Sequence, residues 1–229
     1  EDVNRVLSLF KVKEIGKTFP LAGAHVKFQS AGHILGAISA VIDCGMRIVF
    51  SGDLGRSDDA LILSPELCPP ANFVVMESTY GGRVRQGILK DELEKLLVTA
   101  YKKKNPIIVA SFAVARAQLL LTLIYEFYQK HPEYKLEVFI DSPMMKKANR
   151  VYKKYAEQTK HPEDLYEAIE QANVIEHQKE WDSIKKRTDP FIVLASSGMV
   201  TGGRIWRYLA NWQDEDNVIL FLPGYQAEG

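Results

Sequence analysis

The chain has 229 residues, of which 46% are hydrophobic and 25% are charged, and its 29 basic side chains balance its 29 acidic ones. This is the composition of an ordinary globular protein, and the length suffices for one large domain or two small ones. The zero net charge excludes a basic signature over the whole chain, so any binding to nucleic acid must use a local patch.

Sequence features also set expectations for the compartment. No apolar run reaches the roughly 18 residues that a membrane-spanning helix needs, and Cys44 and Cys68 form no C-x-x-C pair. With no secretory leader in view, we expect a cytoplasmic protein without membrane contact. Because Glu1 is not a methionine and Gly229 follows soon after an apolar run, we also expect a fragment of a longer protein.

The first third of the chain is predicted to form a short helix followed by β-structure. Apolar or alternating segments separated by glycine indicate strands. The helix is expected over residues 2–10, and the strands over residues 26–29, 38–43, 47–51 and 73–77.

After residue 82, predicted strands alternate with long helices, which favours a parallel sheet covered on both faces. The strands are expected over residues 106–111, 136–141, 190–195 and 217–222, and the helices over residues 86–104, 113–130, 143–156, 162–172 and 203–213. The runs FIVLA and VILFL are continuously apolar, as is typical of strands buried on both faces. We therefore predict an α/β protein with domains at residues 1–82 and 83–229.

Two polar side chains lie beside glycines at predicted strand ends. His33 stands in AGHILG, and Asp53 stands in FSGDLGR. Imidazole and carboxylate groups are ligands for zinc, and a carboxylate can bridge two ions. The alternatives are a turn histidine bonded to the backbone and an Asx turn. Two ligands do not complete a metal site, so the chain would carry only part of a hydrolytic centre.

Glu77 ends the strand expected over residues 73–77 and opens the segment ESTYGG. A carboxylate there could orient a ligand histidine by a hydrogen bond or pass a proton to a leaving group. The alternative is a strand-end residue that caps the next turn. We expect the side chains of His33, Asp53 and Glu77 to converge.

A glycine-rich segment connects the strand over residues 190–195 to the helix over residues 203–213. Backbone N–H groups at a helix N-terminus, joined by an arginine, can bind an anion; the alternative is a plain loop. Neither G-x-G-x-x-G nor G-x-x-x-x-G-K-[ST] occurs here, so nucleotide binding of those kinds is not indicated. The candidate substrate-binding residues are Ser197, Gly198, Met199, Thr201, Gly202, Gly203 and Arg204, with Ser111 and Arg116 at a second strand-to-helix turn.

The helix expected over residues 143–156 has a basic face. Such a face could follow phosphates, but a solvated helix surface is the favoured interpretation. The basic residues are Lys146, Lys147, Arg150, Lys153 and Lys154.

Taken in order, these segments resemble the β-CASP branch of the metallo-β-lactamase superfamily, which includes RNA-processing nucleases. AGHILG resembles its third metal motif, FSGDLGR its fourth, and MESTYG the first motif of the β-CASP set. SFAVARAQ, DSPM, ASSGMVTGGR and LPGYQAEG resemble further β-CASP stretches, although Ala115 stands where many members carry glycine. The resemblance implies a partial metallo-β-lactamase αββα portion over residues 1–82. A β-CASP domain with a mainly parallel sheet flanked by helices would follow over residues 83–229.

The resemblance also implies a chemistry. His33 would be a zinc ligand, Asp53 would bridge two zinc ions, and Glu77 would lie beside a metal-bound histidine. A hydroxide would then attack a phosphorus of single-stranded RNA. The His-x-His-x-Asp-His cluster and the motif B and C histidines of the family are not found in this sequence. We therefore expect the isolated chain to be inactive and to bind zinc weakly or not at all.

Other interpretations stay open at this point. The chain could belong to a non-catalytic subunit that binds RNA or a protein. A small-molecule hydrolase of the same superfamily ranks last, because it has no use for the long α/β portion. DNA is an alternative substrate and a homodimer an alternative assembly, and the residues do not distinguish endonuclease from 5′-exonuclease action.

Overall fold

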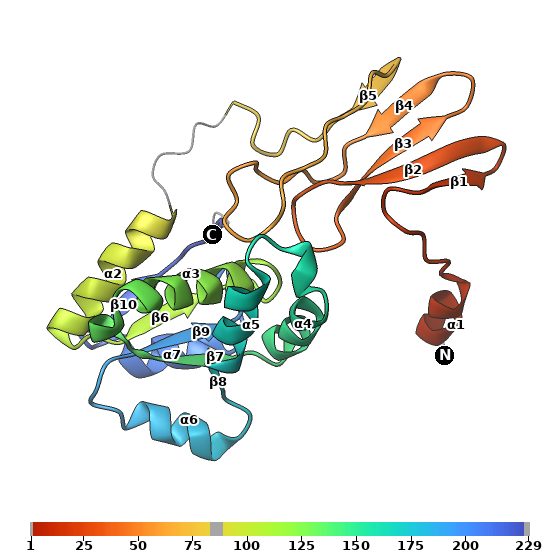
Figure 1. The fold of residues 1–229 in the computed structure, drawn as a ribbon. Helices are drawn as coiled ribbons and strands as arrows, with labels where there is room; N and C mark the ends of the chain where they lie inside the picture. Colours follow the sequence, from red (N-terminus) through yellow and green to blue (C-terminus); the bar gives the residue numbers. More distant parts are fainter. Residues whose placement is uncertain (1, 83–88, 227–229) are drawn as a thin grey trace. The chain divides into compact units, whose positions relative to one another are not determined.

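A computed structural model describes residues 2–82 and 89–226 of the chain. The chain divides into two compact units, Glu1–Arg83 and Val84–Gly229, and each holds one five-stranded sheet in its described part (Figure 1). Residue 1, the start of the helix expected over residues 86–104, and the end of the LPGYQAEG segment lie outside the described residues. Within the described ranges, no helix combines the length and the apolar character that crossing a membrane requires.

The first unit is a helix followed by a mostly antiparallel sheet, in which the strands lie in chain order. Its elements are α1 (Asp2–Leu9), β1 (Thr18–Leu21), β2 (Ala24–Ser30), β3 (Ile38–Asp43), β4 (Arg47–Phe50) and β5 (Phe73–Val75). β5 pairs in parallel with β4, because the long connection between them carries the chain back before it pairs. The edge strand β1 was not predicted; it is exposed and contains Pro20, which weakens a strand signal in sequence.

The second unit is a parallel sheet in the order β10-β6-β9-β7-β8. Its strands are β6 (Ile107–Ala110), β7 (Glu137–Asp141), β8 (Asn173–Val174), β9 (Phe191–Ala195) and β10 (Ile219–Phe221). Its helices are α2 (Leu89–Lys103), α3 (Arg116–Lys130), α4 (Pro143–Lys154), α5 (Pro162–Glu170), α6 (Gln178–Lys185) and α7 (Ile205–Trp212), with short 3-10 turns at Pro132–Tyr134 and Ala156–Gln158. The predicted α/β fold class is confirmed.

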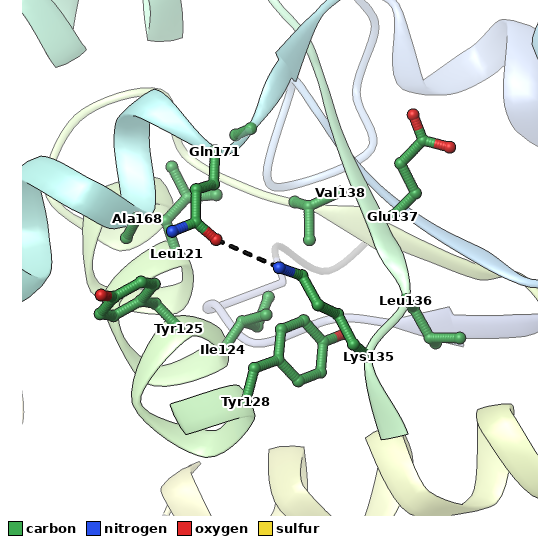
Figure 2. Close-up of a pocket in the computed structure, with 11 residues that line it drawn as sticks. Leu121, Ile124, Tyr125, Tyr128, Lys135, Leu136, Glu137, Val138, Ala168 and Gln171 are labelled. Atoms are coloured by element: carbon green, nitrogen blue, oxygen red, sulfur yellow. Dashed lines mark hydrogen bonds between the residues drawn. The ribbon is translucent and has the colours of Figure 1, made fainter. Parts of the chain in front are cut away.

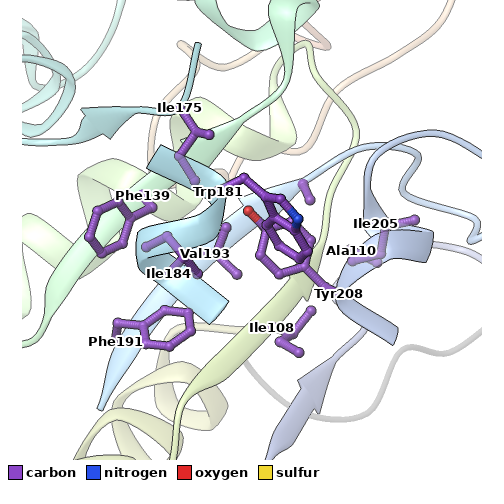
Figure 3. Close-up of a cluster of buried hydrophobic side chains, with 11 residues drawn as sticks. Ile108, Ala110, Phe139, Ile175, Trp181, Ile184, Phe191, Val193, Ile205 and Tyr208 are labelled. Atoms are coloured by element: carbon purple, nitrogen blue, oxygen red, sulfur yellow. The ribbon is translucent and has the colours of Figure 1, made fainter. Parts of the chain in front are cut away.

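Helices cover both faces of this parallel sheet. In Figure 1, α2 and α3 lie on one face and α6 on the other. Every residue of β6 and β9 is buried as a result, which explains their continuous apolar sequences. Figure 3 shows the core on the α6 and α7 side, where Trp181 and Tyr208 lie close to Val193 of β9. The rings of Trp181 and Tyr208 meet edge to face, with centroids 4.7 Å apart.

Two elements of the second unit were not predicted, α6 and β8. β8 has only two residues, and α6 buries only Trp181 and Ile184, so neither carries a strong periodic pattern. α6 does begin with a capping box, in which Glu180 Oε2 accepts a hydrogen bond from His177 N at 2.8 Å. The signal is hard to recognise because histidine replaces the usual serine or threonine.

A cavity of about 320 Å³ lies between α3, the start of β7 and the end of α5 (Figure 2). Its walls are mostly apolar, and Lys135 Nζ donates a hydrogen bond to Gln171 Oε1 at 3.4 Å beside it. Tyr128 contributes to the lining. Its hydroxyl faces the Leu136 backbone without reaching hydrogen-bonding geometry, and no described group is its partner. The cavity lies at the amino end of β7, away from the carboxyl ends of the strands.

Two of the buried tyrosines, Tyr128 and Tyr208, provide a matched test of this packing. Tyr128→Phe removes a hydroxyl without a partner and should leave the free energy of unfolding unchanged or raise it by up to about 1 kcal/mol. Tyr208→Phe removes a hydroxyl that donates to Asp141 Oδ2 at 2.8 Å and should lower it by about 1.5–3 kcal/mol. All three tryptophans lie in this unit, so urea unfolding followed by tryptophan fluorescence reports on it. A larger loss in Tyr128→Phe than in Tyr208→Phe would contradict the assignment.

Candidate active site

Three loops of the first unit are joined by hydrogen bonds that their backbone N–H groups donate. These loops, residues 31–36, 51–56 and 76–79, are called the three-loop cluster. Gly55 N donates to Ala31 O at 2.8 Å, and Leu54 N donates to the Glu77 carboxylate at 2.6 Å. Glu77 N donates to Ser51 Oγ at 3.0 Å. The cluster therefore joins the three segments that carry His33, Asp53 and Glu77.

Close approach within the cluster depends on Gly55. A Cβ atom at this position would lie 1.6 Å from Gly32 O and 2.6 Å from His33 N. Only glycine allows backbones to pass this closely. The loop of Asp53 and the loop of His33 are thus in direct backbone contact.

The three candidate side chains differ in exposure. His33 and Asp53 are exposed, and Glu77 is half-buried. Hydrogen bonds from the Thr79 side chain and the Leu54 N–H lower the pKa of Glu77, and the nearby His33 lowers it further. Glu77 is therefore a carboxylate at neutral pH. This favours the role of a hydrogen-bond acceptor that orients a histidine over the role of a proton donor.

The donor chemistry of the cluster suits zinc only in part. The imidazole of His33 and the carboxylate of Asp53 are ligand types that zinc accepts. Among residues 2–82 and 89–226, however, no three histidine, cysteine, aspartate or glutamate side chains form a group that could hold a metal ion. Zinc sites in proteins use three or four protein ligands. The described part of the chain thus provides an incomplete ligand set.

Substituting Gly55 tests the contact that holds the cluster together. Gly55→Ala should destabilise the first unit by about 3 kcal/mol, because overpacking against backbone atoms cannot be relieved by a rotamer change. Gly202→Ala is the control, since nothing lies within 4 Å of a Cβ there; it should change stability by less than about 0.5 kcal/mol. Hydrogen exchange of peptides from β2 to β4 measures the effect. Equal protection in Gly55→Ala and the unmodified chain would disprove the contact.

The second unit places its candidate residues at a change in connection direction. The chain leaves β6 through α3 toward β7, and it leaves the neighbouring β9 through α7 toward β10 on the other side. Ligands of open α/β sheets bind outside the carboxyl ends of such strands. The two loops that follow β6 and β9, residues 111–115 and 196–203, are called the carboxyl-edge loops.

The carboxyl-edge loops touch each other. Ser111 N donates to Ala195 O at 2.9 Å, and a Cβ at Gly198 would lie 2.6 Å from Phe112 N. The second loop turns back on itself, since Ser197 N donates to Gly202 O at 3.1 Å.

The candidate residues of the second loop differ in exposure, and two of them are in contact. The hydroxyls of Ser197 and Thr201 lie 3.4 Å apart. Met199 and Gly202 are half-buried, Gly198 is buried and Gly203 is exposed. Ser111 is buried at the floor of the first loop, and Arg116 is half-buried at the start of α3.

The arginine of the predicted anion site donates hydrogen bonds to groups of the protein itself. Arg204 Nη1 donates to Asp141 Oδ1 at 2.5 Å and to Ile175 O at 3.2 Å. Asp141 is fully buried and also accepts from Arg207 and from Tyr208. A buried carboxylate requires such partners, so the guanidinium of Arg204 is committed to it. Arg204 therefore anchors the start of α7 through Nη1, and its role in phosphate binding stays a prediction.

Sequence reasoning did not single out Asp141 or Ser142 as site residues. Both stand in DSPM, where Ser142 Oγ caps α4 by accepting from Met145 N at 3.2 Å and Pro143 occupies the first turn. Ser142 Oγ also accepts from Ser196 Oγ at 2.9 Å. The serine–proline pair is a helix-start signal, which identifies the cap but not its contact with the loop after β9.

Ala115 also has a structural explanation. Its φ is 64° and its ψ is −60°, and Arg116 N donates to Val114 O at 2.8 Å. This is a γ-turn of the strained kind, which glycine adopts more easily than alanine. The geometry explains why glycine would suit this position.

The basic face of α4 is partly neutralised. Lys146 pairs with Glu176, and Lys153 pairs with Glu170. These pairs favour the solvated interpretation of this face over a track for phosphates.

Comparison with known proteins identifies the family. The family model of the Beta-Casp domain matches residues 117–229. Residues 117–229 thus belong to the Beta-Casp domain family. It is 29% identical over 242 residues to Ribonuclease TTHA0252 of Thermus thermophilus, with all of this chain and 55% of that protein covered. It is 26% identical over 236 residues to Cleavage and polyadenylation specificity factor subunit 3-I of Arabidopsis thaliana, with all of this chain and 34% of that protein covered.

A fungal protein, Endoribonuclease YSH1 of Mycosarcoma maydis, is 28% identical over 207 residues, with 87% of this chain and 24% of that protein covered. The chain thus spans about half of the first relative and a smaller share of the other two. The family membership predicted from the sequence motifs is confirmed. The roles of His33, Asp53 and Glu77 stay predictions.

Proposed function

We propose that this chain is part of a nuclease that hydrolyses phosphodiester bonds of RNA during RNA processing or decay. The observation that carries the proposal is the three-loop cluster, which joins the segments of His33 and Asp53 by backbone contact and the segments of Asp53 and Glu77 by hydrogen bonds to side chains. The relatives named as a ribonuclease and an endoribonuclease support the same reaction class. A cytoplasmic location is part of the proposal.

Zinc is the proposed cofactor. His33 and Asp53 would contribute ligands, further protein donors would have to complete the set, and Glu77 would orient a ligand histidine through its carboxylate. Bound zinc would lower the pKa of a water molecule toward about 7, which makes a nucleophile available at neutral pH.

The carboxyl-edge loops are the proposed contact surface for the RNA backbone. Ser197 and Thr201 present adjacent hydroxyls, and the second loop lies at the change in connection direction where α/β sheets bind ligands. Single-stranded RNA is the favoured substrate, and DNA is the alternative.

Replacing Asp53 tests the proposed reaction. In the whole protein, Asp53→Ala should reduce RNA cleavage at least about a hundredfold, because loss of a bridging ligand disrupts a metal site more than loss of an outer hydrogen bond does. The measurement is the cleavage rate of a labelled single-stranded RNA.

Asp58→Ala is the matched control for this experiment. Asp58 is another exposed carboxylate of the same segment and is paired with Arg56, so its loss should leave the cleavage rate within about twofold. Full activity of Asp53→Ala would refute the proposed role. A whole protein that binds RNA and never cleaves it would favour the alternative of a non-catalytic binding subunit.

Zinc binding by the isolated chain provides a second test. Because metal affinity requires a full set of deprotonated ligands held together, we expect weak zinc binding that Asp53→Ala reduces further. Isothermal titration with zinc, and equilibrium dialysis followed by metal analysis, measure it. Stoichiometric zinc that survives dialysis against a mild chelator would show that the chain completes a site, contrary to the proposal.

A further inference from the structure

An unusually placed aromatic side chain lies next to the second carboxyl-edge loop. Trp206, in the first turn of α7, is 58% exposed. The other tryptophans pack in the core between the sheet, α6 and α7, where Trp181 is 7% exposed and Trp212 contacts it. Trp206 is therefore the tryptophan with the largest exposed fraction in the part of the chain that the structure describes.

The ring of Trp206 is fixed to the loop at one edge. Its indole N–H donates to Val200 O at 2.7 Å. The polar edge of the ring is thus satisfied by the loop, which leaves the face for contacts with another molecule. A tryptophan held in this way loses little conformational entropy when a partner binds.

A second exposed aromatic residue is the sequence neighbour of a residue bonded to the same loop. Tyr225 is 50% exposed, and its neighbour Gln226 donates through Nε2 to Gly198 O at 2.8 Å. In the loop between β9 and α7, Val200 O therefore accepts from an aromatic side chain, and Gly198 O accepts from the residue that follows an exposed tyrosine in sequence. Ser197 and Thr201, whose hydroxyls lie 3.4 Å apart, flank these two carbonyls in sequence.

This combination is typical of surfaces that bind single-stranded nucleic acid. Such surfaces contact the backbone with polar groups and stack bases on aromatic faces, at about 1–3 kcal/mol per base. An apolar protein partner is a poorer fit, because covering Trp206 would also bury the polar loop next to it.

We propose that Trp206 is a stacking platform for a nucleobase of the strand whose phosphate lies on the loop Ser197–Gly203. The proposal rests on the proposed function, since it assumes that this loop contacts the RNA backbone. The proposed contact at α7 requires that a base be present but does not distinguish one base from another. Tyr225 is the candidate platform for a neighbouring base.

The experiment compares two oligomers of equal length bound to the 229-residue chain. One is an oligoadenylate of about eight nucleotides, and the other is its abasic ribose-phosphate counterpart. Trp206→Leu should weaken oligoadenylate binding by about 5- to 100-fold and leave abasic binding unchanged. Trp206→Phe should restore part of the affinity, and Trp212→Phe serves as a control for a tryptophan in the core.

Fluorescence provides an independent readout. Stacking should quench the emission of the unmodified chain when oligoadenylate binds, and this quenching should be lost in Trp206→Phe but kept in Trp212→Phe. Abasic oligomer should cause little quenching.

The outcomes separate this proposal from the proposed function. If both oligomers bind and Trp206→Leu changes neither affinity, stacking is refuted while backbone binding by the loop stands. If neither oligomer binds the unmodified chain, the backbone contact itself fails, and the stacking proposal fails with it.

If Trp206→Leu weakens binding of both oligomers equally, Trp206 only shapes the loop. If it instead dissociates a dimer in size-exclusion chromatography, the ring is an interface between copies. Either of the last two results overturns the proposal.

Discussion

The buried carboxylate of Asp141 is the interaction on which the second unit depends most. It ends β7 inside the protein with no exposure to solvent, and two arginines and a tyrosine of the α7 region donate to it. Removing one partner of a buried pair leaves a charge without compensation, at a cost of about 3–5 kcal/mol. Because breaking these contacts would cost this much, the start of α7 is held against β7. The loop that enters α7 is therefore held at its far end by charge as well as by apolar contacts.

The first unit achieves a similar constraint without buried charge. There the loops of His33 and Asp53 are held by the backbone approach at Gly55, and the Glu77 carboxylate accepts an N–H from the segment of Asp53. A carboxylate that anchors a neighbouring loop keeps that loop in register while its own remaining oxygen lone pairs stay available. Both units thus use an acidic side chain at a strand end to position a loop, one in the core and one near the surface.

The sequence predicted the parts of this structure that follow from local pattern. The apolar runs of β6 and β9 and the long helix α3 were located within a few residues, because continuous burial leaves a strong signal. The short elements β1, β8 and α6 were missed, since pairing at a sheet edge or two buried side chains provide no periodicity. Arg204 pairs with Asp141, which is 63 residues away in sequence. The local pattern that suggested phosphate binding by Arg204 did not reveal this pairing. Long-range pairing of this kind is a tertiary property that no local pattern contains.

The turns after β6 and β9 share one more property. Ala115 and Val200 have φ angles of 64° and 57°, a region that costs a non-glycine residue about 1–2 kcal/mol. For Val200 the surroundings that maintain this conformation are visible: its side chain packs against the core on α6 and α7, and its carbonyl accepts the indole N–H of Trp206. The same indole therefore stabilises the strained backbone and presents its face to solvent. A ligand that rests on this face would act on the loop through one hydrogen bond, so the proposed contact with a base would be coupled to the shape of the loop that we propose as the phosphate contact.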